Sequence, residues 1–188
     1  MRVVFMILFC SLLAAQAASA RADHAQKIAS LIDPAKLATL RERGANPRVQ
    51  KAVYWLETAR KEGEKPAKVL DRAVALAGYK DALLRNLDIA EKLGCLNEAG
   101  LAEMKRGKAA TVMKGPYKGD PLSVDHIIPR AVVPELDCVI ANLELLPLRL
   151  NESKNDKVGS RQRSLATKLH DAGLLSAEGL RKVQRAKR

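Results

Sequence analysis

The sequence predicts a mainly α-helical protein that carries one short β-hairpin in front of its last helices. Helix-capping residues and helical spacing of apolar residues fill residues 21–108. A β-branched run then lies at Val124–Ile128, and a second short apolar run follows at Leu143–Leu148. Helical spacing returns from Asn151 onward. We therefore expect a helical platform, a two-stranded hairpin and C-terminal helices.

The first twenty residues have the pattern of a secretory signal peptide. Arg2 supplies a positive start, residues 3–15 form an apolar run, and Ala18-Ser-Ala20 is a small-residue cleavage signal. The apolar run is shorter than the roughly 20 residues that a membrane span needs. We expect cleavage after Ala20, a secreted or periplasmic protein, and no stable membrane insertion of the mature chain.

The remaining chain is long enough for one domain with a substantial core. We divide it into a helical region, residues 21–108, and a region at residues 109–188 that contains the hairpin and basic C-terminal helices. Both are expected to form one compact unit, residues 21–188. In the helical region, Asn or Asp residues in front of prolines predict helix starts, and glycines predict helix ends. The expected helices span residues 34–43, 46–62, 66–77, 81–93 and 97–105.

Residues that can carry chemistry gather in and after the predicted hairpin. Asp125 and His126 stand at the end of its first strand, and Asn142, Asn151 and Lys154 follow. A histidine beside a carboxylate, with amide side chains further on, can combine a general base with an oxygen-rich metal site. Asp and Asn oxygens suit Mg²⁺ or Mn²⁺ better than Zn²⁺. An isolated Asp-His pair would more often simply end a strand and cap a turn.

This set of residues resembles the signature of the HNH endonuclease family, whose ββα-metal site cuts phosphodiester bonds. The resemblance covers Lys118–Lys157, about a fifth of the 188 residues. It implies that His126 is the general base and that Asp125 and Asn151 hold one divalent metal ion, Mg²⁺ or alternatively Mn²⁺. It also implies that Asn142 ties the loop to the catalytic strand and keeps the base oriented.

Many family members carry two Cys-x-x-Cys pairs that hold a structural zinc ion. This chain has no such pair, so we expect no structural zinc. Lys154 falls where many members have a lysine that faces phosphate, and Arg149 and Arg130 are further candidates for binding phosphate. The basic segment that leads into the motif, from Lys105 to Lys118, is either a solvated loop or a second phosphate contact.

The charge of the chain favours a polyanionic partner. The net charge is +12, and removal of Arg2 with the signal peptide makes it +11. Aromatic residues make up only 3% of the chain, and both phenylalanines lie in the first twenty residues. Base stacking needs exposed aromatic rings, so contacts to phosphates fit better, with DNA as the expected nucleic acid.

These observations predict an exported, metal-dependent HNH endonuclease that hydrolyses nucleic acid with low sequence specificity. The main alternative is a non-catalytic, basic nucleic-acid-binding protein of the cell envelope, which would bind DNA without metal. A further alternative is a helical envelope protein whose partner is another protein or an acidic surface.

Cysteine and histidine usage outside the motif gives two more expectations. Cys95 and Cys138 remain after signal-peptide removal and are either a disulfide or two separately buried thiols. A disulfide would close a loop of about forty residues and stabilise the fold by about 3–4 kcal/mol. We expect His24 and His170 to be surface residues, since neither has acidic or amide partners at a useful spacing in the sequence.

Overall fold

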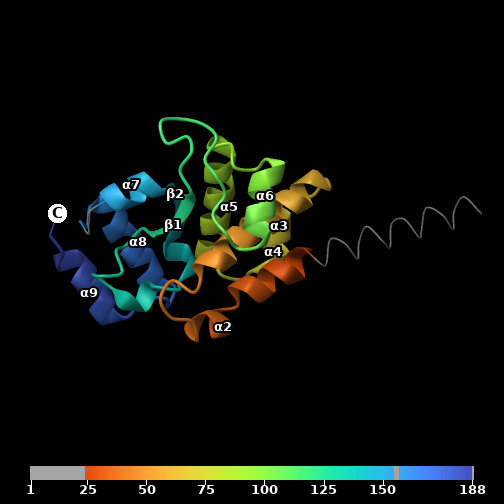
Figure 1. The fold of residues 1–188 in the computed structure, drawn as a ribbon. Coiled ribbons are helices and arrows are strands. Elements are labelled where there is room, and N and C mark those ends of the chain that lie inside the picture. Colours follow the sequence, from red (N-terminus) through yellow and green to blue (C-terminus); the bar gives the residue numbers. More distant parts are fainter. Residues whose placement is uncertain (1–23, 155–156, 188) are drawn as a thin grey trace, which may run out of the picture.

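The computed structural model describes residues 24–154 and 157–187 (Figure 1). The signal peptide predicted at residues 1–20 lies outside the described residues. Within the described ranges the chain is mainly helical, and its strands form a two-stranded antiparallel hairpin. The hairpin lies between the platform helices and the C-terminal helices α8 and α9 (Figure 1). The predicted fold class is confirmed. No helix in these ranges has both the length and the hydrophobicity to cross a bilayer.

The platform contains the expected series of helices, with different boundaries in two places. The helix predicted to reach Arg43 ends at Ala38, and Gly78 lies in the first turn of a helix instead of ending one. The helix that begins at Pro66 ends at Ala73, because Val74 has an extended backbone with φ −140° and ψ 126°. Residues 24–32 are helical as well. The platform helices are α2 (Pro34–Ala38), α3 (Asn46–Lys61), α4 (Pro66–Ala73), α5 (Ala77–Lys92) and α6 (Glu98–Lys105).

Side-chain caps explain several of these starts. Asp33 accepts a hydrogen bond from the backbone N–H of Ala35, and Asn97 accepts one from Gly100, each at 2.9 Å. Such caps satisfy backbone donors that the first turn leaves without partners. Asn46 is different, because it is the first residue of α3 and makes no side-chain cap.

The hairpin consists of β1 (Leu122–His126) and β2 (Leu143–Pro147), with two short 3₁₀ helices, η1 (Pro134–Leu136) and η2 (Ile140–Asn142), in the long loop between them. Buried amides of the platform hold both strands. Gln50 of α3 donates to the carbonyl of Leu122 at 2.7 Å. Asn86 of α5 donates to the carbonyl of Leu143 at 3.1 Å and accepts from the N–H of Leu145 at 2.8 Å. The side chain of Asn86 thus pairs with β2 as a neighbouring strand would.

A short helix, α7 (Leu148–Ser153), follows β2 directly and contacts both strands. The helical spacing from Asn151 onward does not form one continuous helix, because Lys154 has an extended backbone with ψ 124° and ends α7. The later helices are α8 (Ser160–Asp171) and α9 (Ala177–Arg185). Ser176 caps the last helix, accepting from the N–H of Gly179 at 2.9 Å.

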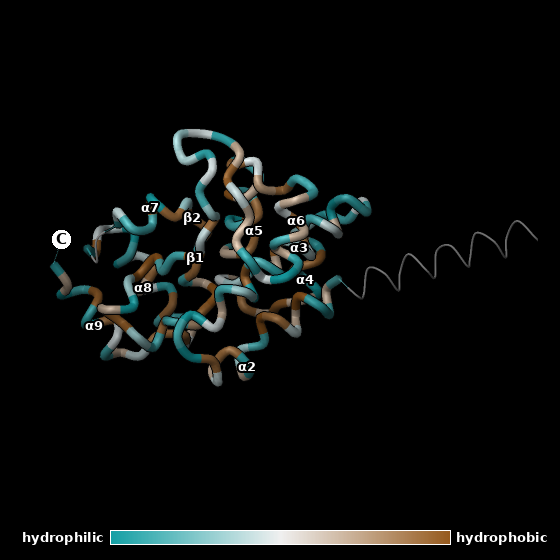
Figure 2. Tube along the Cα trace, in the orientation of Figure 1, coloured by the Kyte–Doolittle hydropathy of each residue, from teal (hydrophilic) through white to brown (hydrophobic). Residues whose placement is uncertain are grey.

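The buried apolar residues form one contiguous cluster that draws on the platform, the hairpin and the C-terminal helices. The inner turns of α3 and α5 are apolar, and the polar segments lie toward the outside (Figure 2). The fully buried members from successive parts of the chain include Val49, Leu56, Leu83, Leu143, Leu145, Val158 and Val183.

Cys95 and Cys138 are free thiols, so of the two alternatives left open by the sequence the structure has separate thiols. Cys138 shares a groove with Tyr79, which lies in the first turn of α5, whereas Cys95 follows the end of that helix. A helix of 16 residues is about 24 Å long. A disulfide requires Cα atoms about 4.4–6.8 Å apart, so α5 separates the two thiols too far.

The two histidines outside the motif are not free surface residues. His24 is buried, with 5% of its surface exposed, and its ring nitrogens lie 3.6 Å from a carboxylate oxygen of Glu62 and 3.3 Å from one of Glu64. Nδ1 of His170 lies 2.9 Å from the carbonyl of Leu175. The expectation of surface histidines fails because folding brings in partners that are about forty residues away from His24 in the sequence.

Candidate active site

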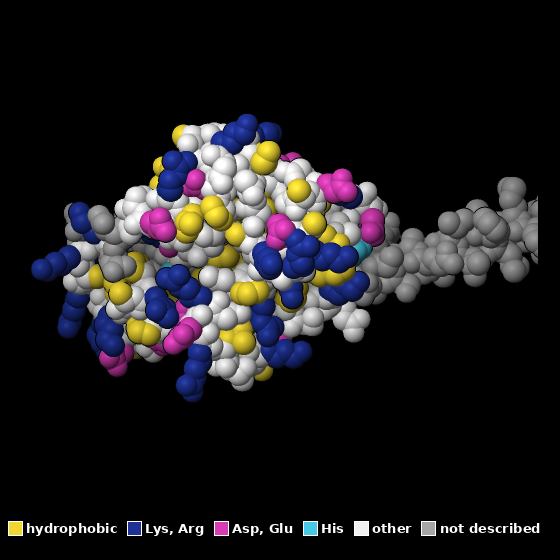
Figure 3. Space-filling view, in the orientation of Figure 1, with side chains coloured by type: hydrophobic (Ala, Val, Ile, Leu, Met, Phe, Trp, Pro, Cys, Tyr) yellow, Lys and Arg dark blue, Asp and Glu magenta, His cyan; other side chains and the backbone are white. Residues whose placement is uncertain are grey.

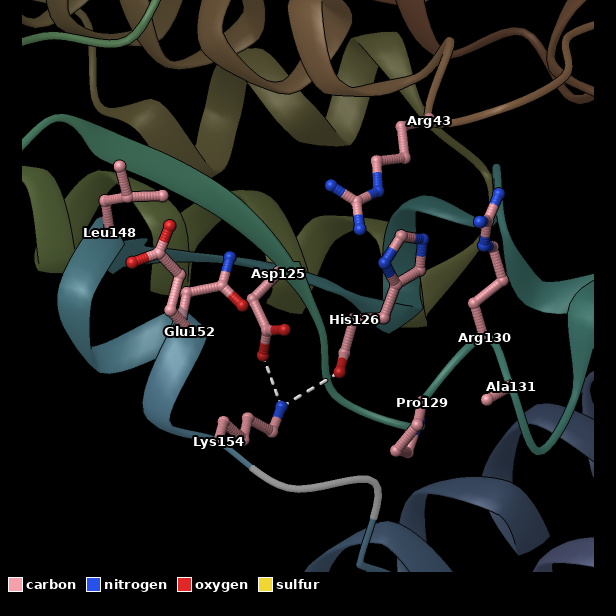
Figure 4. Close-up of a pocket in the computed structure, with 10 residues that line it drawn as sticks. Arg43, Asp125, His126, Pro129, Arg130, Ala131, Leu148, Glu152 and Lys154 are labelled. Atoms are coloured by element: carbon pink, nitrogen blue, oxygen red, sulfur yellow. Dashed lines mark hydrogen bonds and ion pairs between the residues drawn. The ribbon is translucent and has the colours of Figure 1, made fainter.

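A cavity of about 390 Å³ lies at the end of β1 (Figure 4). It brings together most of the side chains that the motif predicted. Arg43 and Glu152, which the motif did not predict, line it as well. The strand β1 supplies Asp125 and His126, and α7 with the residue after it supplies Asn151, Glu152 and Lys154. Arg43 and Arg130 enter from two separate loops.

Asn142 holds the base of the long loop and does not line the cavity. It is fully buried, and its side chain accepts from the N–H of Ile128 at 2.8 Å and donates to the carbonyl of the same residue at 3.0 Å. The N–H of Ile127 donates to the Asn142 carbonyl at 2.8 Å. These bonds fix the backbone directly after His126, which is the location that the predicted orienting role requires.

His126 is held by Asp137, a residue that sequence analysis missed. Nε2 of His126 lies 3.0 Å from the main-chain carbonyl of Asp137 and 3.0 Å from its Oδ1. Both atoms are acceptors, so this environment places the ring hydrogen on Nε2. The other ring nitrogen, Nδ1, is then the unprotonated one, which can accept a proton.

Asp137 also connects the site to the platform. Its Oδ2 accepts a hydrogen bond from the N–H of Arg43 at 3.1 Å and lies 4.0 Å from the guanidinium of Arg130. Glu42 and Arg43 have φ angles of 48° and 63°, a left-handed conformation that costs a non-glycine residue about 1–3 kcal/mol. In this conformation the side chain of Arg43 points toward the His126 ring (Figure 4).

Lys154 binds Asp125 rather than facing open solvent. Its ammonium forms an ion pair with Oδ2 of Asp125 and donates to the carbonyl of His126 at 2.9 Å (Figure 4). The point between this carboxylate and this carbonyl is therefore one where the fold already accommodates a positive charge.

The donor set at this point fits a magnesium ion. Asp125, Asn151 and Glu152 line the same cavity, and all three offer oxygen atoms. Nδ2 of Asn151 donates to Oγ of Ser123 at 3.0 Å, which leaves the amide oxygen as the atom available to a cation. Among the described residues, no group of three or more His, Cys, Asp or Glu side chains is placed to hold a metal ion. A metal here would therefore need the Asn151 amide and water as ligands.

The other phosphate candidates have different environments. Arg130 lines the cavity, with nearly half of its side chain exposed. Arg149 does not line it. Its Nε pairs with Oδ1 of Asp120 at 2.7 Å, its N–H donates to Oδ2 at 3.1 Å, and its guanidinium lies 5.7 Å from the Tyr117 ring. In this structure Arg149 fastens the start of α7 to the segment before β1.

A second carboxylate stands beside Asp125 on the hairpin. Glu144 is its cross-strand partner, and like charges at such a position destabilise a sheet. Arg161 of α8 binds both carboxylate oxygens of Glu144, at 3.0 and 2.5 Å. This hydrogen bonding raises the pKa of Arg161 above its usual value, so the guanidinium stays charged and neutralises Glu144.

Asp137 and Arg43 were not predicted from the sequence, and only Asp137 could have been. Asp137 lies between the two halves of the motif, so an acidic residue in that loop could have been proposed as a partner for His126. Nothing in the sequence marks Arg43, which is 94 residues away from the carboxylate that its N–H binds.

Comparison with protein-family models, curated proteins and solved structures found no match to this chain. A functional assignment therefore depends on the chemistry of the residues themselves.

Proposed function

We propose that this protein is an exported, metal-dependent endonuclease of the HNH type that hydrolyses phosphodiester bonds in nucleic acid, with DNA as the expected substrate. The observation that carries the proposal is that Asp125 and His126 of β1 line one cavity with Asn151 of α7. Asn142 closes the loop behind them, which is the arrangement that the motif implies.

His126 is the proposed general base. With its ring hydrogen on Nε2, held by Asp137, Nδ1 takes a proton from a water molecule as that water attacks phosphorus. The carboxylate of Asp137 stabilises the positive ring that forms, and its carbonyl keeps the ring from rotating. The site is thus built to produce a nucleophile from water beside bound phosphate.

Asp125 and Asn151 are the proposed ligands of one divalent metal ion, Mg²⁺ or alternatively Mn²⁺. Such an ion stabilises negative charge on the phosphoryl and leaving oxygens. For the ion to bind Asp125, the ammonium of Lys154 must leave that carboxylate, and it would then be free to contact phosphate. Arg43 and Arg130, which line the cavity, are proposed to bind the phosphate oxygens.

The ion pair between Lys154 and Asp125 favours a second candidate function. If the ammonium stays on the carboxylate in place of a metal ion, the protein is a non-catalytic, basic nucleic-acid-binding protein of the cell envelope. Its affinity for DNA would fall steeply with salt and would not depend on divalent metal.

Incubation of the purified protein with supercoiled plasmid separates the two candidates. We expect nicking with Mg²⁺ or Mn²⁺ and none with EDTA. Retention of intact plasmid that weakens with salt and ignores EDTA would refute the nuclease proposal and support the binding protein.

A further inference from the structure

A group of cations gathers where the end of α6 meets the start of α3. Gly107, just after α6, has φ +80°, and a Cβ atom at this position would lie 2.9 Å from Cβ of Pro47 and 3.1 Å from Cε of Lys51. This close approach fixes the end of α6 against the first turns of α3. We name Lys51, Lys105, Arg106 and Lys108 the α3–α6 cation cluster.

Most of this positive charge is not neutralised by the protein. Arg106 pairs with Glu103, but the other three members make no ion pair with any carboxylate of the described residues. Some lysines on other helices do have acidic partners: Lys80 lies 3.2 Å from a carboxylate oxygen of Asp71, Lys92 lies 2.7 Å from one of Asp88, and Lys182 lies 2.8 Å from one of Glu178. Lys and Arg side chains gather on the face where α3 and α6 meet (Figure 3).

The surroundings of the cluster favour phosphate over other ligands. The ammonium of Lys105 lies 5.8 Å from the centre of the Tyr54 ring, so this ring already has a cation on it and is not an open platform for a base. Membrane surfaces are bound by exposed apolar side chains together with cations. Met113 is the one large hydrophobic side chain that is exposed among the described residues, and it lies outside the cluster.

We propose that the α3–α6 cation cluster is a second nucleic-acid-binding surface, which contacts the phosphate backbone outside the cavity. The proposal rests on the proposed function for the identity of its polyanion. Lys51 is eight residues from Arg43 at the cavity, and eight residues span at most about 29 Å even when fully extended. That upper limit is less than one turn of duplex DNA, about 34 Å, so one bound duplex is long enough to reach both places.

The test compares two triple variants with the same loss of charge. One replaces Lys51, Lys105 and Lys108 by Gln. The control replaces Lys80, Lys92 and Lys182 by Gln, and both variants lower the net charge by three. Dissociation constants for a duplex of about 20 base pairs are measured at several salt concentrations. EDTA is present throughout, so that metal-dependent cleavage is excluded.

We expect the cluster variant to bind at least about tenfold more weakly and to lose about 2–3 units from the slope of log K against log salt, since each phosphate contact contributes roughly 0.9. The control variant should change the slope by less than about half a unit. Equal changes in both variants, or no change in the cluster variant, would overturn the proposal.

Hydrolysis of bis(p-nitrophenyl) phosphate, which is too small to reach the cluster from the cavity, separates this inference from the proposed function. The cluster variant should hydrolyse it at the wild-type rate, and a loss of that activity would mean that the substitutions disturb the cavity instead. If the wild type hydrolyses neither this ester nor DNA, the nuclease proposal fails, while the salt slopes still decide whether the cluster binds nucleic acid.

Discussion

The three oxygens of Asp137 face two partners in the candidate site. Its carbonyl and Oδ1 face His126, and Oδ2 binds the N–H of Arg43. Through this one residue, the orientation of the base and the placement of a guanidinium depend on each other.

Arg43 offers a test of that arrangement with a control in the same loop. Because its guanidinium enters the cavity, Arg43→Ala should lower the rate of plasmid cleavage about tenfold or more by removing a phosphate contact. Arg41→Ala removes a nearby exposed arginine that does not line the cavity, and it should cleave at nearly the wild-type rate. Equal rates for the two variants would exclude the proposed role of Arg43.

The ion pair between Lys154 and Asp125 leads to a prediction about metal affinity. Its ammonium competes with a divalent ion for Asp125, so Lys154→Met should bind Mn²⁺ more tightly, by about tenfold or ~1.4 kcal/mol. Calorimetric titration with Mn²⁺ in the absence of DNA measures this directly. Asp125→Asn serves as the control and should weaken binding. Weaker Mn²⁺ binding by Lys154→Met would show that the lysine does not compete with the ion.

Among the elements, the contact between α5 and the hairpin depends on one buried amide. Asn86→Ala leaves the N–H of Leu145 without a partner, at about 1–3 kcal/mol for a buried group, and removes one hydrogen bond to the carbonyl of Leu143, worth about 0.5–1.5 kcal/mol. That carbonyl keeps a longer bond from Arg85 at 3.3 Å. We expect urea denaturation to show a loss of about 2–4 kcal/mol. Asp88→Ala, at an exposed position of the same helix, should cost less than about 1 kcal/mol. Similar losses in both variants would mean that Asn86 does not hold the hairpin.

Local chemistry explains which elements could be predicted. The caps at Asp33 and Asn97 act within three residues, so those helix starts could be predicted from the sequence. The end of α4 was misplaced because Val74 adopts an extended backbone that no glycine or proline marks. Helix boundaries that depend on tertiary packing carry no such local signal.

The same distinction holds for the candidate site. Asp125, His126, Asn151 and Lys154 could be proposed because together they resemble one family motif within residues 125–154, and they line one cavity. The acidic partners of His24 could not be foreseen, since the contact joins residues far apart in the chain.

In the whole molecule, the thiols of Cys95 and Cys138 lie near opposite ends of α5, so their reactivity tests the overall arrangement of the fold. Burial raises the pKa of Cys95 to about 11 and also raises that of Cys138, which is only partly buried. Both therefore stay protonated at neutral pH. Peptide mapping after iodoacetamide treatment at pH 8 should find Cys138 slowly alkylated, Cys95 unmodified and no disulfide between them. A disulfide-linked peptide pair would contradict the described fold.

Burial of Cys95 also predicts a pH dependence of stability. Its folded-state pKa lies above the 9.0 of an unburied thiol, so its contribution to the free energy of unfolding is complete below pH 9. That contribution is lost as the pH rises toward 11. Cys95→Ser should flatten this part of the curve in urea denaturation at several pH values, and an unchanged curve would mean that another group titrates there.

The central claim is that His126 is the base of a metal-dependent nuclease. A time course of plasmid nicking with Mg²⁺, for the wild type beside His126→Ala at matched DNA saturation, tests it most directly. We predict that the wild type nicks the plasmid and that the variant is at least about 100-fold slower, with unchanged circular dichroism and DNA affinity. Nicking by the variant at the wild-type rate would contradict the claim.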